Sequence, residues 1–386
     1  MDFSLDENQA MFKKLTWDFV KKEISSKILE LEKRDDFPID IIKKAWEVGV
    51  MNLCVPEESG GLGIDPISIA VIVEEVAYGC SGIATSVMAN DLANVVVALH
   101  GTKEQKEKYL RPFTENPLLS SFCLTEAEAG SDNLAMGTYI QKRSDGKYVL
   151  NGSKQFITNA TYADQFTVFC KLNRPKSQIL TCLVTPRKPA EGKIETGKPE
   201  EKLGQHLSNT ASVTFDNVVI DPSQIIGDRR LGFQYLIDVL DFTRPMIAAI
   251  GCGLARKAYD LTLSYTKSRV QFGQRISDMP VARETLVKMY NNMRTAYIMT
   301  MYASWKLKTK SKDKGVYASL AKNMAAKAAL FNANEGLHLH GGYGFMKEYE
   351  ISKLVRDAHI LDIYEGTREV QSMIEGRGIV TDNVHQ

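Results

Sequence analysis

The feature that most constrains the fold is the order of two hydrophobic patterns along the chain. From Glu7 to about Pro117, apolar residues recur every three or four positions, the spacing of an amphipathic helix. From Leu118 to about Pro222, short runs rich in β-branched and aromatic residues are separated by turn-forming residues. After Gly232 the helical spacing returns almost to the end. Because the two patterns are segregated, they predict an α+β protein rather than an alternating βαβ fold.

The middle block is typical of an antiparallel barrel or sandwich. Its extended runs end at Gly, Asn, Asp or Pro and cover residues 148–152, 165–169, 179–184 and 213–220. We therefore expect three domains: an all-α N-terminal domain over 1–117, a central β domain over 118–228 and a C-terminal helical bundle over 229–386.

Two apolar stripes in the last block predict long helices. One begins at Leu236 and ends at Leu261, and the other runs from Leu286 to Leu307 with alternating spacings of three and four. The segment Gly251-Cys252-Gly253 lies within the first stripe. No strand precedes it and no third glycine follows at the required spacing, so it fails the dinucleotide-binding fingerprint and is typical of close helix packing.

Charge, hydropathy and cysteine content exclude several classes of function and indicate a cellular compartment. The 48 basic and 47 acidic residues leave a net charge of +1 without a basic stripe, which argues against a nucleic-acid-binding protein. Apolar stretches such as Pro66–Val73 are interrupted by charge before the roughly 20 residues that cross a bilayer, so we expect no membrane span. The first residues resemble no leader, and the six scattered cysteines form no C-x-x-C pair. We therefore expect a cytoplasmic protein with reduced thiols.

Three segments have residues suited to chemistry. The loop Thr125–Asp132 follows a strand and offers small and hydroxyl residues to a polar ligand, although such loops are commonly plain turns. In Asp362–Thr367 an acid stands beside a glycine before a helix, which suits either a positioned base or a helix N-cap. In His338–Phe345 two histidines precede a glycine-rich run. No acid or further histidine completes a ligand set there, so we predict no metal site.

Taken in order, eight motifs spread over nearly the whole chain resemble those of the acyl-CoA dehydrogenases, closest to the short- and medium-chain branch. They are Glu57-Glu58-Ser59-Gly60-Gly61; Leu124-Thr125-Glu126 with Ala129-Gly130-Ser131-Asp132; Asn151-Gly152-Ser153-Lys154 with Ile157-Thr158-Asn159; Thr243-Arg244-Pro245; Ser268-Arg269 with Gln271-Phe272-Gly273; His340-Gly341-Gly342-Tyr343-Gly344; Arg356-Asp357-Ala358; and Ile363-Tyr364-Glu365-Gly366-Thr367.

The resemblance implies an FAD enzyme that removes a proton and a hydride from an acyl-CoA thioester. It implies a C-terminal four-helix bundle, a homotetramer with FAD between subunits, and an electron-transfer flavoprotein as acceptor. Glu365 would be the base, and its backbone N–H would help to bind the thioester oxygen. Some relatives carry the base at a position on the helix that holds Thr243; in this chain that position is not acidic, which favours Glu365.

The resemblance also implies the binding residues. From one subunit, FAD would be held by Phe122, Leu124, Thr125, Gly130, Ser131, Phe156, Thr158, Thr367 and Glu369. From a neighbouring subunit, it would be held by Arg269, Gln271, Phe272, His338, Gly341 and Gly342. CoA would be contacted by Ser131, Asp241, Arg244 and Gly366.

Three positions depart from the family pattern. Phe156 stands where Trp is common, His338 where Gln is common, and Met279-Pro280 where Phe-Gln is common. The last two changes remove amides that would face the dinucleotide.

Asp91 adds an unusual acid in a segment that lines the deep end of the acyl pocket in relatives. One interpretation makes it a second base for an alicyclic substrate, cyclohexane- or cyclohexene-carboxyl-CoA; the other turns it away to hydrogen-bond a helix end. Alternatives for the whole chain are a linear short- or medium-chain dehydrogenase, a flavin oxidase of the nitroalkane type and a non-enzymatic acyl-CoA-binding scaffold.

Overall fold

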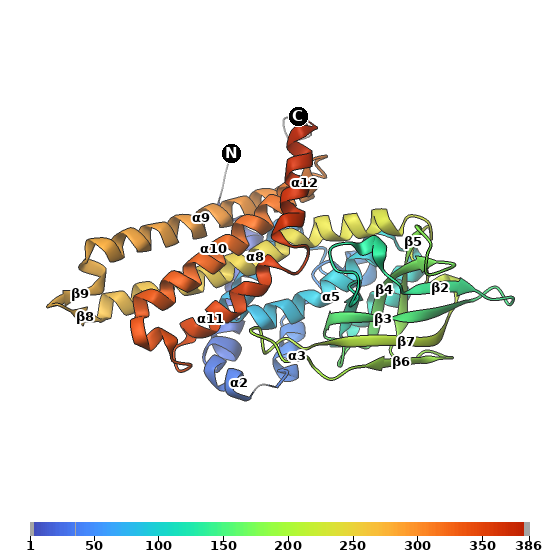
Figure 1. Cartoon of the computed structure of the whole chain (residues 1–386), viewed down its shortest axis with the longest axis horizontal. Helices are drawn as coiled ribbons and strands as arrows, with labels where there is room; N and C mark the ends of the chain where they lie inside the picture. The colour runs from blue at the N-terminus through green and yellow to red at the C-terminus, as the bar shows by residue number, and fades with distance from the viewer. Residues whose placement is uncertain (1–3, 35, 382–386) are drawn as a thin grey trace.

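The computed structural model describes residues 4–34 and 36–381 of the chain. Figure 1 shows a helical half and a sheet half, with α5 (Ser81–His100) between them. The helical N-terminal and C-terminal domains and the central sheet domain agree with the predicted fold class.

The N-terminal domain consists of short helices packed around two buried ones, α4 and α5. Side-chain caps fix several starts: Asp65 accepts from the backbone N–H groups of Ile67 and Ser68 at the start of α4, and Thr102 forms a capping box with Gln105. The elements are α1 (Glu7–Phe19), η1 (Val20–Ser25), α2 (Ile28–Arg34), α3 (Ile39–Glu47), η2 (Glu57–Ser59), α4 (Pro66–Gly79), α5 (Ser81–His100), α6 (Lys103–Tyr109) and α7 (Arg111–Glu115).

The central domain is a seven-stranded sheet. Its path is β1-β4-β2-β3-β7-β6, and β5 pairs with β4. The elements are β1 (Ser120–Cys123), η3 (Asn133–Ala135), β2 (Tyr139–Lys142), β3 (Tyr148–Thr158), β4 (Gln165–Leu172), β5 (Leu180–Pro186), β6 (Lys193–Thr196), β7 (Thr210–Ile220) and η4 (Pro222–Gln224). The sheet is mixed rather than purely antiparallel, because β4 pairs in parallel with both β1 and β2.

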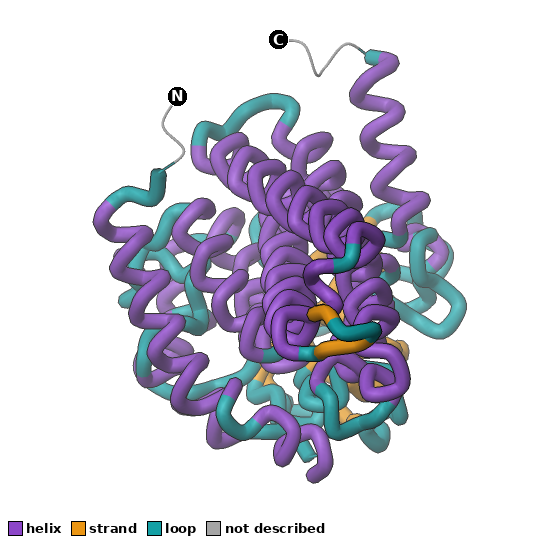
Figure 2. The backbone as a smooth tube through the Cα atoms, turned by 90° about the vertical axis from the view of Figure 1, so that its left-hand side faces the viewer, coloured by secondary structure: helices purple, strands orange, loops and turns teal. Residues whose placement is uncertain are grey.

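The C-terminal domain is a bundle of long helices, as predicted. Its elements are α8 (Gly232–Ser268), β8 (Val270–Gln271), β9 (Gln274–Arg275), η5 (Ile276–Asp278), α9 (Pro280–Lys308), α10 (Lys314–His340), η6 (Gly341–Phe345), α11 (Glu350–Ala358), η7 (His359–Asp362) and α12 (Arg368–Val380). The predicted stripes are the buried faces of α8 and α9. A β8–β9 hairpin, which the sequence analysis did not predict, lies at the end of the bundle that faces the viewer in Figure 2.

Among the described residues, one helix, α5, is long and apolar enough to cross a membrane by length and composition, although it contains Asp91. However, 83% of its most apolar window is buried inside the protein. Its hydrophobicity is that of a core helix between two domains.

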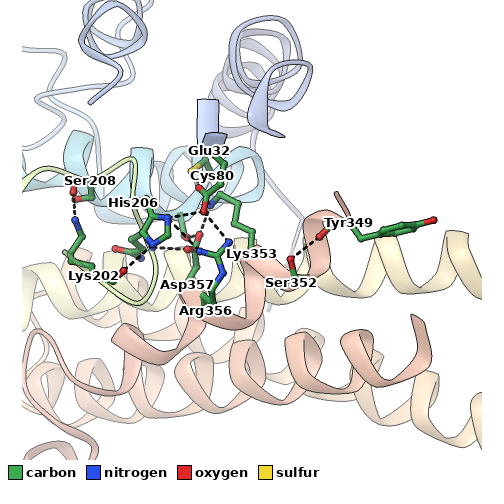
Figure 3. Close-up of polar contacts among 12 residues, drawn as sticks. Glu32, Cys80, Lys202, His206, Ser208, Tyr349, Ser352, Lys353, Arg356 and Asp357 are labelled. Atoms are coloured by element: carbon green, nitrogen blue, oxygen red, sulfur yellow. Dashed lines mark hydrogen bonds and ion pairs between the residues drawn. The ribbon is translucent and has the colours of Figure 1, made fainter. Parts of the chain in front are cut away.

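A buried ionic network joins the domains at the start of α5 (Figure 3). Asp357 on α11 contacts the Lys353 ammonium and accepts from Ser81 Oγ at 2.9 Å and from the Gln205 backbone N–H at 2.6 Å. Glu32 on α2 pairs with Arg356 at 3.0 Å. The network ties α2, α5, the 202–208 loop and α11 together.

Candidate active site

Glu365 lies in a turn between η7 and α12, beside α8 and α10. Its Oε2 atom is 3.0 Å from Thr243 Oγ1 on α8, and that hydroxyl also lies 3.1 Å from the Val239 carbonyl. Its backbone has φ +57°, a left-handed conformation that is uncommon outside glycine. Such strain persists only where the surroundings hold it, and it clusters at functional sites.

Three side chains hold the carbonyls of this turn. Gln371 Nε2 donates to the carbonyl oxygens of both Glu365 and Gly366 at 2.9 Å. Arg244 Nε donates to the Glu365 carbonyl at 3.4 Å, and Lys322 Nζ donates to the Gly366 carbonyl at 2.8 Å. Helices α8, α10 and α12 therefore fix the Glu365 backbone from three sides.

The helix that follows does not use Glu365 as its cap. Thr367 is the N-cap of α12, and its side chain accepts from the Val370 backbone N–H. The capping task in this segment therefore belongs to Thr367, which leaves the Glu365 carboxylate free for other partners.

The electrostatics of Glu365 suit a base that must give and take a proton. Burial raises the pKa of its carboxyl, while the hydrogen bond from Thr243 and the charges of Arg244 and Lys322 act in the opposite direction. Burial makes the carboxylate more basic, and the two cations keep its ionised form accessible.

Asp241 and Arg244 form a neighbouring polar pair on α8. Arg244 Nη1 lies 3.6 Å from Asp241 Oδ1, and both residues are buried. Gly315, at the start of α10, leaves room for the Asp241 carboxylate, because an added Cβ would come within 2.8 Å of both its oxygens. Gly366 is also a predicted CoA contact. It directly follows Glu365, whose carbonyl accepts the hydrogen bond from Arg244 described above.

The predicted loop after β1 is anchored from beneath by a buried lysine. Lys154 Nζ donates to the Leu124 carbonyl at 2.9 Å and to Glu126 Oε1 at 2.8 Å. Thr125 is tied through its carbonyl, which accepts from the Gln155 N–H at 2.8 Å. The loop backbone is therefore fixed on the sheet side.

The outer side of that loop is open. Gly130 and Ser131 are exposed, and an added Cβ at Gly130 would meet no atom within 4 Å. Phe122 is partly buried against Phe169, and Thr158, at the end of β3, accepts from Ser121 Oγ through its carbonyl.

Phe156 is the most unusual residue of this surface. It has φ +59° at an irregularity of the β3–β7 ladder, and 63% of its surface is exposed. A left-handed aromatic residue facing solvent suits a flat ligand that covers the ring.

The remaining predicted residues gather around a groove at the other end of the bundle. Arg269, Gln271 and Phe272 come from the β8–β9 hairpin, and His338, Gly341 and Gly342 come from the junction of α10 and η6. The groove has a volume of about 810 Å³. Its floor includes Tyr265, which stacks on His340 with ring centroids 4.2 Å apart.

Two features of the groove suit a ligand that arrives from outside. Phe272 is 94% exposed at the hairpin turn. Neither Gly341 nor Gly342 would bring an added Cβ within 4 Å of another atom, so the backbone there is open.

The two groups of residues do not meet within one chain. Arg269, the C-cap of α8, follows Thr243 by 26 positions, which corresponds to about 39 Å along the helix axis. Figure 1 shows β8 and β9 at the far end of the bundle from the sheet. Thr367 and Glu369 lie with the Glu365 group, at the start of α12.

Asp91 is buried on α5, and its carboxylate contacts the 52–55 loop rather than the Glu365 turn. Its Oδ1 accepts from the Cys54 backbone N–H at 2.6 Å, and it is fully buried. Thr85, about one and two-thirds turns earlier, has its hydroxyl 3.4 Å from Tyr364 Oη beside Glu365. Six helical residues rotate Asp91 by about 120° from that face. Its carboxylate therefore holds the 52–55 loop.

Sequence reasoning missed several site residues. Thr243 and Lys154 belong to recognised motifs, which could have marked them. Lys322 and Gln371 stand inside helical stretches and carry no local signal. Among the described residues, no group of three or more His, Cys, Asp or Glu side chains could hold a metal ion.

The site thus combines a buried carboxylate on a left-handed turn, two buried cations and an open surface on the sheet of an α+β chain. Profiles of the N-terminal, middle and C-terminal domains of acyl-CoA dehydrogenases match residues 6–116, 121–218 and 230–380. The chain belongs to the acyl-CoA dehydrogenase family.

Individual relatives match over nearly their whole length. A probable acyl-CoA dehydrogenase, YngJ, from Bacillus subtilis is 36% identical over 98% of this chain and 100% of its own. A 3-(aryl)acrylate reductase from Clostridium sporogenes is 37% identical over 95% of this chain and 97% of its own. The structure of butyryl-CoA dehydrogenase from Megasphaera elsdenii superposes with a TM-score of 0.94 at 32% identity, covering 98% of this chain and 100% of that one.

Proposed function

We propose that Glu365 removes the α-proton of an acyl-CoA thioester in this FAD-dependent oxidoreductase. The observation that carries the proposal is the Glu365 carboxylate, basic through burial and held by Thr243 on a turn fixed from three helices. The carboxylate takes up the proton and becomes the neutral acid. FAD, when bound, accepts the hydride from the β-carbon, so the acyl-CoA becomes an enoyl-CoA and the flavin is reduced.

The residues present fit FAD. Gly130 and Ser131 offer an open backbone on the β domain, and Phe156 offers an uncovered ring. An acyl-CoA dehydrogenase from Bacillus anthracis, 28% identical with a TM-score of 0.92, was solved with FAD. The match covers 98% of this chain and 68% of that one.

The substrate's carbonyl would be held by the Glu365 backbone N–H, whose orientation the left-handed turn sets. Arg244 and Asp241 would contact the CoA portion. We propose a short linear acyl group, because butyryl-CoA and short-chain dehydrogenases are among the similar proteins. By microscopic reversibility, the protonated Glu365 can return the proton to the α-carbon in the reductive direction, which the arylacrylate reductase relative is named for.

The alicyclic alternative depends on Asp91 as a second base. Its Oδ2 atom is buried with no hydrogen-bond partner among the described residues, which favours proton chemistry. Its position about 120° around α5 from Thr85 weighs against contact with the acyl group. If Asp91→Asn keeps full activity on butyryl-, cyclohexanecarboxyl- and cyclohexenecarboxyl-CoA, the second-base role is excluded.

We also propose that FAD binds between two copies in a homotetramer, because the Arg269 groove and the Glu365 turn lie at opposite ends of one bundle. An electron-transfer flavoprotein is the proposed acceptor. A chain in the structure of the electron transferring flavoprotein of Acidaminococcus fermentans superposes with a TM-score of 0.94 at 32% identity, covering 98% of this chain and 100% of that one.

Glu365→Gln tests the base. The amide keeps the size of the side chain but cannot accept a proton, so flavin bleaching by butyryl-CoA should fall by about 10²-fold or more. Binding of the thioester should persist, measured as the spectral shift of oxidised flavin on adding butyryl-CoA. Bleaching at the wild-type rate would show that another group removes the proton.

A further inference from the structure

Lys322, on α10, is one of the two buried cations beside Glu365. Only 1% of its surface is exposed, and its Nζ donates to the Gly366 carbonyl at 2.8 Å. A lysine is rarely buried so completely, because desolvation of the ammonium costs several kcal/mol unless opposite charges and hydrogen bonds compensate.

The partners around Lys322 belong to the Glu365 turn. It interacts electrostatically with the carboxylates of Asp362 and Glu365 and, more weakly, with Glu369; Arg244 opposes it. Burial nevertheless lowers the pKa of Lys322 to about 8. The buried Lys322 ammonium is thus stabilised by the carbonyl of Gly366 and by the negative charges of the acids on either side of that carbonyl.

The contact between Lys322 and Gly366 supports a backbone conformation that is unfavourable on its own. Glu365 has φ +57° and Gly366 has φ +94°, so two consecutive residues are left-handed. A non-glycine residue in this region costs about 1 kcal/mol or more. Lys322 and Gln371 together occupy the Gly366 carbonyl, which favours this geometry over the ordinary right-handed one.

We propose that Lys322 is a positioning residue for the base: its buried ammonium holds the 365–366 turn through the Gly366 carbonyl and supplies a positive charge that favours the ionised form of Glu365. The inference deepens the proposed function and rests on it. Lys322 touches neither the substrate nor the transferred proton.

The proposed role separates into a charge and a hydrogen bond, and three substitutions distinguish them. Lys322→Met removes both, Lys322→Gln keeps an amide donor without charge, and Lys322→Arg keeps the charge. The measured quantity is the rate of flavin bleaching by butyryl-CoA in the holoenzyme from pH 5 to pH 9.

Losing the charge should move the acidic limb of the profile upward by roughly one pH unit, since a nearby opposite charge lowers a carboxyl pKa by about that much or more. Lys322→Met and Lys322→Gln should then be about tenfold slower than wild type below the limb. The difference should vanish at pH values above both limbs, where Glu365 is ionised with or without the cation. Lys322→Arg should keep the limb at the wild-type pH.

A purely structural role would lower the rate by the same factor at every pH. Lys257→Met is the matched control, because Lys257 is another buried lysine, on α8, whose ion pair with Glu350 at 3.2 Å lies away from the turn. It should leave the pH profile unchanged.

A wild-type limb position in Lys322→Gln, or a pH-independent loss in all three variants, would overturn the inference. Should Lys322→Met fail to fold, the comparison of Gln with Arg at this position decides the same question. The result is separable from the base assignment: Glu365→Gln with undiminished bleaching refutes the proposed function, whereas loss of bleaching there together with an unshifted Lys322→Gln refutes the role of Lys322 alone.

Discussion

The carboxylate of Asp91 lies where its ionisation costs free energy. Burial raises its pKa from 3.8 to about 6, although the Cys54 backbone N–H partly compensates. The native protein therefore holds the Asp91 proton at pH values where the unfolded chain has released it. This contribution to stability is complete below the unfolded pKa and is lost as the pH rises through about 6.

Asp91→Asn should therefore gain relative stability with rising pH. The amide cannot ionise and keeps an oxygen for the Cys54 N–H. Between pH 4 and pH 7 the stability difference should move in favour of the variant by about 2 kcal/mol. Parallel thermal melts at pH 4 and pH 7 check this; an equal difference in melting temperature at both pH values would contradict the burial argument.

Site residues could be predicted from the sequence where they belong to one local motif. Glu365, Gly366 and Thr367 are consecutive, so their pattern is readable in one place. Lys322 reaches the same turn from 44 positions away, in a stretch whose alanines indicate only a packed helix. A contact between distant segments leaves no periodic signal, and it appears only when the fold brings them together.

Among the elements, α11 depends on one ion pair. Burial alone would raise the pKa of Asp357, but the Lys353 ammonium and the donors Gln205 and Ser81 hold it below its ordinary value. The ionised pair therefore stabilises the fold above the ordinary carboxyl pKa and is lost as the pH falls through the lowered one.

Asp357→Asn should destabilise the protein by about 3 kcal/mol, because it removes the nearest counter-charge of the buried Lys353 ammonium and leaves only Glu32 at 3.9 Å. Thermal or urea unfolding measures the loss. Glu284→Gln is the control, since it breaks an exposed i,i+4 pair with Lys288 on α9 and should not change the melting temperature. A comparable loss of stability in both variants would show that the buried network around α11 contributes no more than an exposed ion pair.

Helices were predicted better than strand pairing. The three-and-four spacing from Leu286 onward is the buried face of α9. By contrast, β1 and β4 pair in parallel although 41 residues separate Cys123 from Gln165 in the chain numbering, and nothing in either run specifies that partner. The two-residue strands β8 and β9 are too short to show any alternation.

For the whole molecule, a site divided between copies predicts complementation. Arg269→Ala should weaken FAD binding and Glu365→Gln should abolish bleaching, each alone. In oligomers assembled from both variants, a site that takes Glu365 from one copy and Arg269 from another is intact.

Random pairing of equal amounts makes at most about a quarter of the sites intact. Co-expressed variants carrying different affinity tags, purified through both tags, should therefore bleach with butyryl-CoA at limiting FAD faster than either parent. Each parent mixed with itself is the control. Hybrids as inactive as the parents would place the whole site in a single chain.

Helix α8 carries Thr243 near one end and leads into the β8–β9 hairpin at the other. It is thus a spacer of fixed length between two half-sites. Deleting one residue between them shortens it by about 1.5 Å and turns the hairpin by about 100°, so the two ends would fall out of phase. Insertions and deletions in this stretch should be tolerated far less than substitutions, whatever their effect on helix formation.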